Sequence, residues 1–95
     1  MPFFKIEFNL EALRKLAERG ISVEEVTEVF QLTPGCLDRE SESSRREQSL
    51  VDGPTRIGRF LTIIVDRDRA DHGLWHVMTA WDSTEPQVRL YRNAL

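Results

Sequence analysis

Apolar residues in the first third of the chain recur at two spacings, one typical of a strand and one typical of a helix. Phe4, Ile6 and Phe8 occupy every second position, which predicts a half-buried strand. A helix is predicted after Asn9, a favoured N-cap residue, because the leucines that follow share one stripe at helical spacing. Gly20 ends this helix at the position where a left-handed residue is favoured.

The second predicted helix has a complete N-terminal signature. Ser22 and Glu25 form an S-x-x-E capping box, in which each side chain accepts a hydrogen bond from the other's backbone N–H. Val26, Val29 and Phe30 then face one side. The helix is expected to end near Pro34, because the residue before a proline disfavours helical geometry.

A charged segment and three strands are predicted next. Residues 37–47, LDRESESSRRE, contain seven charged residues and one apolar residue, which predicts a mobile surface loop. Strands are predicted over residues 48–51, 55–65 and 74–81. A turn at Asp52-Gly53-Pro54 and a polar connection over residues 66–73 separate them.

A C-terminal helix is indicated by a second capping box. Thr84 and Gln87 provide its two side chains, and Val88, Tyr91 and Leu95 lie on one stripe. The local signals therefore predict an α+β chain with the element order β-α-α-β-β-β-α. Ninety-five residues allow one compact domain, which we expect to span residues 1–95.

The charge balance and the single cysteine narrow the function classes. Thirteen basic and sixteen acidic residues give a net charge of −3, whereas nucleic-acid-binding domains are more often basic. Contacts to phosphate would therefore depend on local clusters of arginine, which supplies eleven of the thirteen bases. Because Cys36 is alone, no apolar run is long enough to cross a membrane and no signal peptide is visible, we expect a cytoplasmic protein.

No metal or cofactor site is expected from the sequence. His72 and His76 are four residues apart, but one falls in the predicted connection and the other on a strand. The HExxH, P-loop and GxGxxG motifs are absent, and so is a calcium loop with its required glycine and final glutamate. We therefore expect a protein that works without a cofactor.

Side chains that handle phosphate groups and protons are concentrated late in the chain: Arg59, His76, Trp81, Arg89, Tyr91 and Arg92. If the C-terminal helix packs beside the sheet, a guanidinium, an indole and a phenol converge. Arginine neutralises charge on a phosphate, tyrosine moves a proton and tryptophan stacks on an unpaired base. The alternative is that the arginines form surface ion pairs and that His76 only hydrogen-bonds a neighbour on the sheet.

Three stretches resemble the BrnT-type toxins of bacterial type II toxin–antitoxin pairs, which belong to the wider group of RelE-like small ribonucleases. Residues 15–26, KLAERGISVEEV, resemble that family's basic helix, glycine and capped second helix. Residues 55–65, TRIGRFLTIIV, resemble its glycine–arginine strand. Residues 77–84, VMTAWDST, followed by Tyr91, resemble its last strand and terminal helix.

The resemblance implies a small antiparallel sheet of about four strands, with two N-terminal helices on one side and a C-terminal helix. It implies metal-independent RNA cleavage, in which a ribose 2′-hydroxyl attacks the adjacent phosphate. Arg59 and Tyr91 match the motif positions of catalytic residues, and the residues left to contact an RNA substrate are Trp81, His76, Arg89 and Arg92. The implied partner is a cognate antitoxin, a small DNA-binding protein that covers the active face.

Two departures from the BrnT pattern keep a second function open. Trp81 stands where that family has an arginine, and Gln87 stands where it usually has a glutamate. Loss of a cation at a phosphate site costs about 2–4 kcal/mol of transition-state stabilisation. Residues 12–26 also resemble a family of unknown function, DUF4258, which shares the fold. The alternative is therefore a catalytically inactive member that acts as a protein-binding module.

Overall fold

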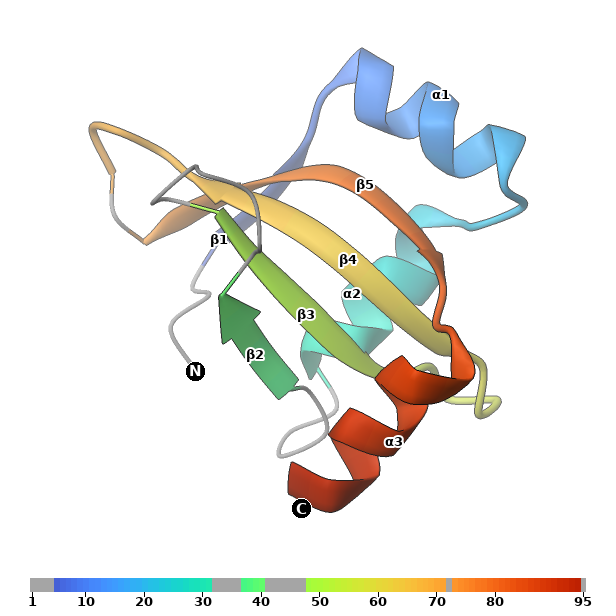
Figure 1. Cartoon of the computed structure of the whole chain (residues 1–95). Coiled ribbons are helices and arrows are strands. Elements are labelled where there is room, and N and C mark those ends of the chain that lie inside the picture. Colours follow the sequence, from blue (N-terminus) through green and yellow to red (C-terminus); the bar gives the residue numbers. More distant parts are fainter. Residues whose placement is uncertain (1–4, 32–36, 41–47, 72, 95) are drawn as a thin grey trace.

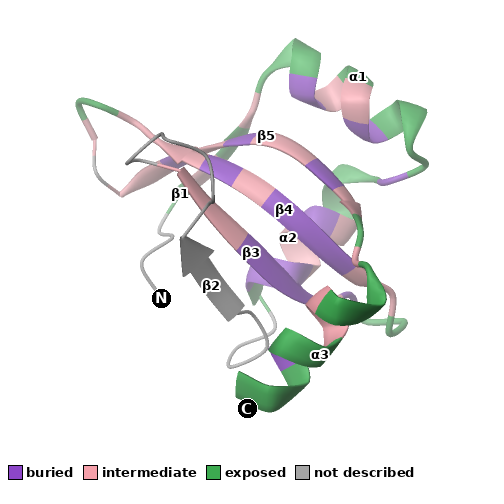
Figure 2. Cartoon of the chain, viewed as in Figure 1, coloured by how far each residue is buried: buried purple, intermediate pink, exposed green. Residues whose placement is uncertain are grey.

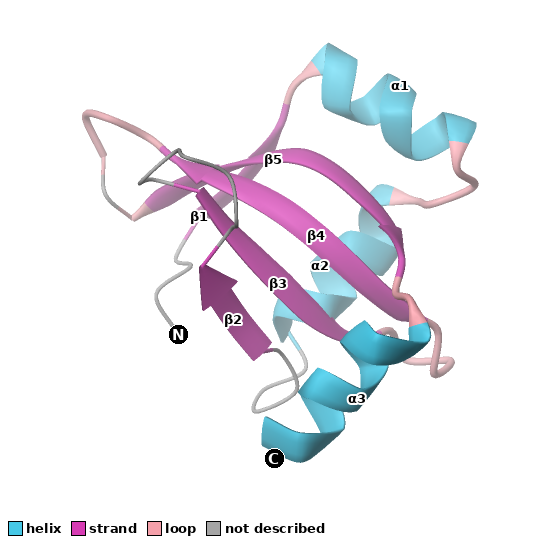
Figure 3. Cartoon of the chain, viewed as in Figure 1, coloured by secondary structure: helices cyan, strands magenta, loops and turns pink. Residues whose placement is uncertain are grey.

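The computed structural model describes residues 5–31, 37–40, 48–71 and 73–94. Within these ranges the chain forms, in order, β1 (Lys5–Phe8), α1 (Leu10–Glu18), α2 (Val23–Gln31), β2 (Leu37–Glu40), β3 (Gln48–Pro54), β4 (Phe60–Arg67), β5 (Leu74–Asp82) and α3 (Glu85–Ala94). The strands form one sheet in the order β1-β5-β4-β3-β2. Helices α1 and α2 pack on one face of this sheet, and α3 lies against the opposite face at one end (Figure 1, Figure 3).

The predicted α+β class is confirmed, and the predicted helices and strands occur in the predicted order, with β2 as an additional strand. β4 pairs antiparallel with both of its neighbours, and Ile63 lies opposite Val51 on one side and Ala80 on the other. β1 runs parallel to β5, so the sheet is mixed and not antiparallel throughout. Helices α1 and α2 and three strands lie between β1 and β5 in the sequence. Because no hairpin turn joins β1 to β5, the two strands can run parallel.

Part of the predicted loop over residues 37–47 is a strand. Residues 37–40 form β2, which pairs antiparallel with β3 from Leu37 opposite Asp52 to Glu40 opposite Ser49. The prediction of a loop was therefore wrong for these four residues, and residues 41–47 lie outside the described part of the chain. Edge strands are commonly short and rich in charge, and for this reason their sequences resemble those of loops.

The turn between β3 and β4 lies later than predicted. Asp52, Gly53 and Pro54 are paired residues of β3, and the turn occupies residues 55–58. It is closed by the N–H of Gly58, which donates to the carbonyl of Thr55 at 3.0 Å. Gly58 has a φ of 86°, a conformation that glycine adopts without strain. Among the described residues, the pairing of β2 with β3 begins at Leu37 opposite Asp52, whereas Pro54 pairs with Phe60 of β4.

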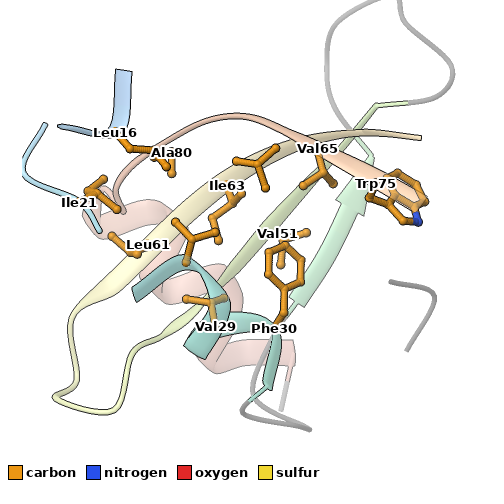
Figure 4. Packing of buried hydrophobic residues seen from close by; sticks show 12 residues of the cluster. Leu16, Ile21, Val29, Phe30, Val51, Leu61, Ile63, Val65, Trp75 and Ala80 are labelled. Atoms are coloured by element: carbon orange, nitrogen blue, oxygen red, sulfur yellow. The ribbon is translucent and has the colours of Figure 1, made fainter. Parts of the chain in front are cut away.

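The hydrophobic core lies between the sheet and the helices α1 and α2. Alternate residues of β4, namely Leu61, Ile63 and Val65, are completely buried on this side. The full cluster comprises Leu16, Ile21, Val26, Val29, Phe30, Val51, Leu61, Ile63, Val65, Trp75, Val77 and Ala80 (Figure 2, Figure 4). Because side chains alternate along a strand, Phe60 and Thr62 point to the other face, toward α3.

All three helices begin with the caps that the sequence predicts. The Asn9 side chain accepts the backbone N–H three residues on at 2.8 Å. Ser22 and Glu25 form their reciprocal pair, and so do Thr84 and Gln87. A helix needs about 20 apolar residues to cross a bilayer, and no helix in the described ranges is long and apolar enough to do so.

Replacing an isoleucine by alanine should affect stability very differently in buried β4 and in the exposed turn that precedes it. Ile63→Ala should lower the free energy of unfolding by about 2–5 kcal/mol, because it leaves a cavity in the core. Ile57→Ala should change it by less than about 0.5 kcal/mol, because Ile57 lies in the turn and is 86% exposed. Denaturant titration of both variants measures the difference, and equal losses would contradict the described packing.

Candidate functional site

The guanidinium of Arg59 is bound on three sides. Its Nε and Nη2 donate to the two carboxylate oxygens of Asp82 at 2.6 and 3.0 Å. Its Nη1 lies 3.0 and 3.2 Å from the carboxylate oxygens of Glu25 and donates to the backbone carbonyl of Gly20 at 3.0 Å. We refer to Arg59, Glu25 and Asp82 as the Arg59 clamp. The clamp connects the start of β4, the first turn of α2 and the end of β5.

The local sequence explains why these groups meet. Arg59 precedes β4 by one residue, and strand alternation points its side chain to the same face as Leu61, beneath α2. Asp82 lies opposite Leu61 in the register of β5 on β4. Glu25 is in the first turn of α2 because of its capping box, and its carboxylate accepts the backbone N–H of Ser22 at 3.0 Å.

The positive charge of Arg59 is compensated by two carboxylates. The hydrogen bond from Arg59 lowers the pKa of Asp82 below its usual value. The pKa of Glu25 is also lowered, chiefly by the backbone N–H of Ser22 and further by Arg59. The two carboxylates in turn raise the pKa of Arg59. The clamp thus carries an excess of one negative charge, which disfavours the approach of a phosphate to the guanidinium.

Tyr91 lies on the other face of the sheet. Its side chain is buried, with 6% exposed, and its ring meets that of Phe60 edge to face, with centroids 5.4 Å apart and planes at 70°. Phe60 and Arg59 are consecutive residues at the start of β4, so their side chains point to opposite faces. The predicted convergence of Arg59 and Tyr91 in one pocket is therefore not found.

Trp81 shares the α3 side of the sheet with Tyr91 and helps to hold α3. It lies opposite Thr62 in the register of β5 on β4, and its Nε1 donates to Oε1 of Gln87 at 3.2 Å. The same Gln87 oxygen accepts the backbone N–H of Thr84 at 2.8 Å. The indole is half-buried, and its polar edge already has a partner within the chain.

A buried polar cluster below α3 was not anticipated from the sequence. The hydroxyl of Thr62 donates to the carboxylate of Asp52 at 2.6 Å and lies 2.8 Å from the hydroxyl of Ser83. Asp52 and Thr62 are both buried. The one feature of the sequence that indicates this cluster is Thr62, a polar residue within the apolar run of β4. Because both side chains are shielded from solvent, the cluster anchors the start of α3 and offers no surface to a substrate.

His76 lies toward the other end of β5. Its Nε2 is 2.9 Å from the carboxylate of Asp68, and its Nδ1 is 4.0 Å from that of Glu7. The bond to His76, with further bonds from backbone N–H groups, lowers the pKa of Asp68 to about 2. Five residues along a strand span roughly 17 Å, so the imidazole is remote from Trp81 and from the α3 side chains.

Arg89 and Arg92 lie on α3 and are exposed. Arg92 places its guanidinium over the Phe60 ring, 5.7 Å from the centroid. Arg89 is 3.7 Å from Glu85, one helical turn away. A shallow hollow runs along the outer side of α3 and is lined by Pro86, Arg89, Leu90 and Asn93. All four of these residues are exposed.

The described residues contain no group of three or more histidine, cysteine, aspartate or glutamate side chains arranged to hold a metal ion. Cys36 and His72 lie outside the described ranges. No protein-family model and no curated protein matches this chain. The likeness to BrnT-type toxins therefore stays a prediction from the sequence motifs.

The Arg59 clamp predicts a stability loss that depends on pH. Arg59→Met should lower the free energy of unfolding by about 1–2 kcal/mol near pH 7, because it leaves two carboxylates without their cation in a partly exposed site. Both carboxylates have a lowered pKa in the folded chain, so their contribution is complete above the ordinary values of 4.5 and 3.8. It is lost as the pH falls through the lower folded-state pKa values.

Chemical denaturation at a series of pH values tests this dependence. The difference between the parent chain and Arg59→Met should shrink steadily as the pH falls below about 4. The matched control is Arg89→Met, which removes an exposed i,i+4 ion pair and should cost no more than about 0.5 kcal/mol. A difference for Arg59→Met that stays constant down to pH 2 would show that the clamp is not electrostatic.

Proposed function

We propose that this chain is a catalytically inactive member of the RelE-like group and acts as a protein-binding module. One observation carries the proposal: Arg59 is neutralised by Glu25 and Asp82 on one face of the sheet, while Tyr91 is packed on Phe60 at the other. Arg59 and Tyr91, which match the motif positions of catalytic residues, thus each contact other residues of the fold and lie on opposite faces of the sheet.

RNA cleavage by this group of residues would need a different arrangement. A 2′-hydroxyl attack requires a cation at the phosphate and a proton-transfer group within hydrogen-bond reach of the same reacting atoms. His76 is bonded to Asp68 far from α3, and Trp81 cannot supply charge in place of an arginine. The net charge of −3 adds no general attraction for RNA.

Support for binding comes from the outer side of α3. Leu90 is 47% exposed there beside Pro86, with Arg89 and Asn93 on the same side of the hollow. Arginine is enriched at the centre of protein interfaces, where most other charged residues are depleted. The buried cluster and the Tyr91–Phe60 contact hold the inner side of α3, so its outer side is presented on a fixed support.

The partner that we propose is a small DNA-binding protein of the antitoxin type, encoded beside this chain and bound in the cytoplasm. This choice rests on the resemblance to BrnT-type toxins, because the members of such pairs are encoded together. The partner would cover the outer side of α3. RNA would not be cleaved, and the complex would depend on contacts to Leu90 and Arg89.

The test combines growth, RNA and binding measurements on the full chain. Induced expression should leave growth unchanged, and the purified protein should leave RNA intact. The product of the adjacent gene should bind, and Leu90→Glu should weaken that binding at least tenfold, because it places a charge in an apolar contact. Val23→Glu is the matched control on another exposed apolar residue and should leave binding unchanged.

The proposal would be overturned by RNA cleavage that disappears in the Tyr91→Phe variant. That variant keeps the ring that packs on Phe60 and removes only the hydroxyl, so its fold should be preserved. Cleavage lost in Tyr91→Phe would assign the catalytic role that the motif predicts. Binding of the adjacent gene product that is unaffected by Leu90→Glu would exclude the outer side of α3 as the interface.

A further inference from the structure

β1 is an edge strand whose outer backbone groups have no partner among the described residues. It is the first strand of the sheet order and pairs only with β5 (Figure 1). The N–H of Lys5 donates to the carbonyl of Gly73 at 2.9 Å, so the backbone groups of Lys5 and Glu7 face β5. The N–H and C=O groups of Ile6 and Phe8 consequently point away from the sheet.

Apolar side chains accompany this open edge. Ile6 and Phe8 are half-buried and pack against the core from its margin. Leu10, two residues further along, is 84% exposed at the first position of α1. A strand added beside β1 would complete the cover over Ile6 and Phe8. The backbone and the side chains of this edge thus favour the same kind of addition.

The charges on β1 indicate which strand fits. Lys5 and Glu7 flank Ile6, and both are exposed on the sheet face that Ile6 does not use. We propose that a second copy of this chain pairs antiparallel with β1 about a two-fold axis at Ile6. In this register Ile6 faces its own counterpart, and Lys5 of each copy faces Glu7 of the other. β1 is therefore complementary to itself.

The other central registers are less favourable. An axis at Lys5 would place two ammonium groups opposite each other, and an axis at Glu7 would place two carboxylates opposite each other. An axis at Ile6 also makes a hydrogen-bonded pair, in which the two isoleucines exchange both N–H···O=C bonds. Lys5 already contacts Asp71, but an ammonium group has three donors and can bind both carboxylates.

The size of the interface sets the expected affinity. A four-residue strand and one leucine per copy bury much less than the roughly 1,600 Å² of a standard interface. The dimer should therefore be weak, with a dissociation constant of about 10 μM or more, and it should form only at high concentration. Opposite charges across the pair should also make it weaker in high salt.

Sedimentation equilibrium over about 1 μM to 1 mM tests the proposal. Lys5→Glu and Glu7→Lys should each weaken dimerisation at least tenfold, because each places like charges opposite each other. The double variant Lys5→Glu with Glu7→Lys should restore the parent affinity to within about threefold. Lys15→Glu is the matched control, since it makes the same charge change at a pair on α1 and should leave the affinity unchanged.

Several outcomes would overturn this inference. The parent chain could stay monomeric at 1 mM, or the double variant could remain as weak as the single variants. A further outcome is that the chain is monomeric and the β1 variants no longer bind the product of the adjacent gene. That outcome would assign the edge of β1 to that partner instead. Circular dichroism shows whether each variant is folded. If a single variant fails to fold, the double variant still tests the proposal, because its net charge is that of the parent chain.

Discussion

The contact that the rest of the structure depends on is the binding of Arg59 to Glu25 and Asp82. Arg59 lies where the β3–β4 turn enters β4, and its partners lie at the start of α2 and the end of β5. One guanidinium thus fixes the point at which three elements meet. Immediately after Asp82, the N–H of Ser83 donates to the carbonyl of Phe60, so the path into α3 follows from the same junction.

Strand alternation explains why Arg59 and Tyr91 do not meet in one pocket. Arg59 and Phe60 are neighbours in sequence, so one faces α2 and the other faces α3. Tyr91 packs on Phe60 and therefore belongs to the second face. A motif records the order and spacing of residues along the chain, but it does not state which face of a strand each one uses.

Features that depend on nearby residues were predictable from the sequence. The capping pairs Ser22–Glu25 and Thr84–Gln87 are each three residues apart, and both are present as expected. The pairing of β1 with β5 and the contact of Arg59 with Glu25 join distant segments, for which local patterns give no signal. The sequence Asp52-Gly53-Pro54 is typical of a turn. In the structure all three residues pair with β4 and therefore belong to β3.

The two surfaces proposed for binding can be occupied at the same time. α3 contacts β3, in the half of the sheet that ends in β2, whereas β1 forms the opposite edge. The inner side of α3 is held by the Tyr91–Phe60 contact, and the core margin at β1 is held by Ile6 and Phe8. Neither surface includes the Arg59 clamp, so binding at either one leaves the central junction intact. A dimer through β1 would therefore carry two independent α3 surfaces, and a partner that binds as a dimer would gain from engaging both.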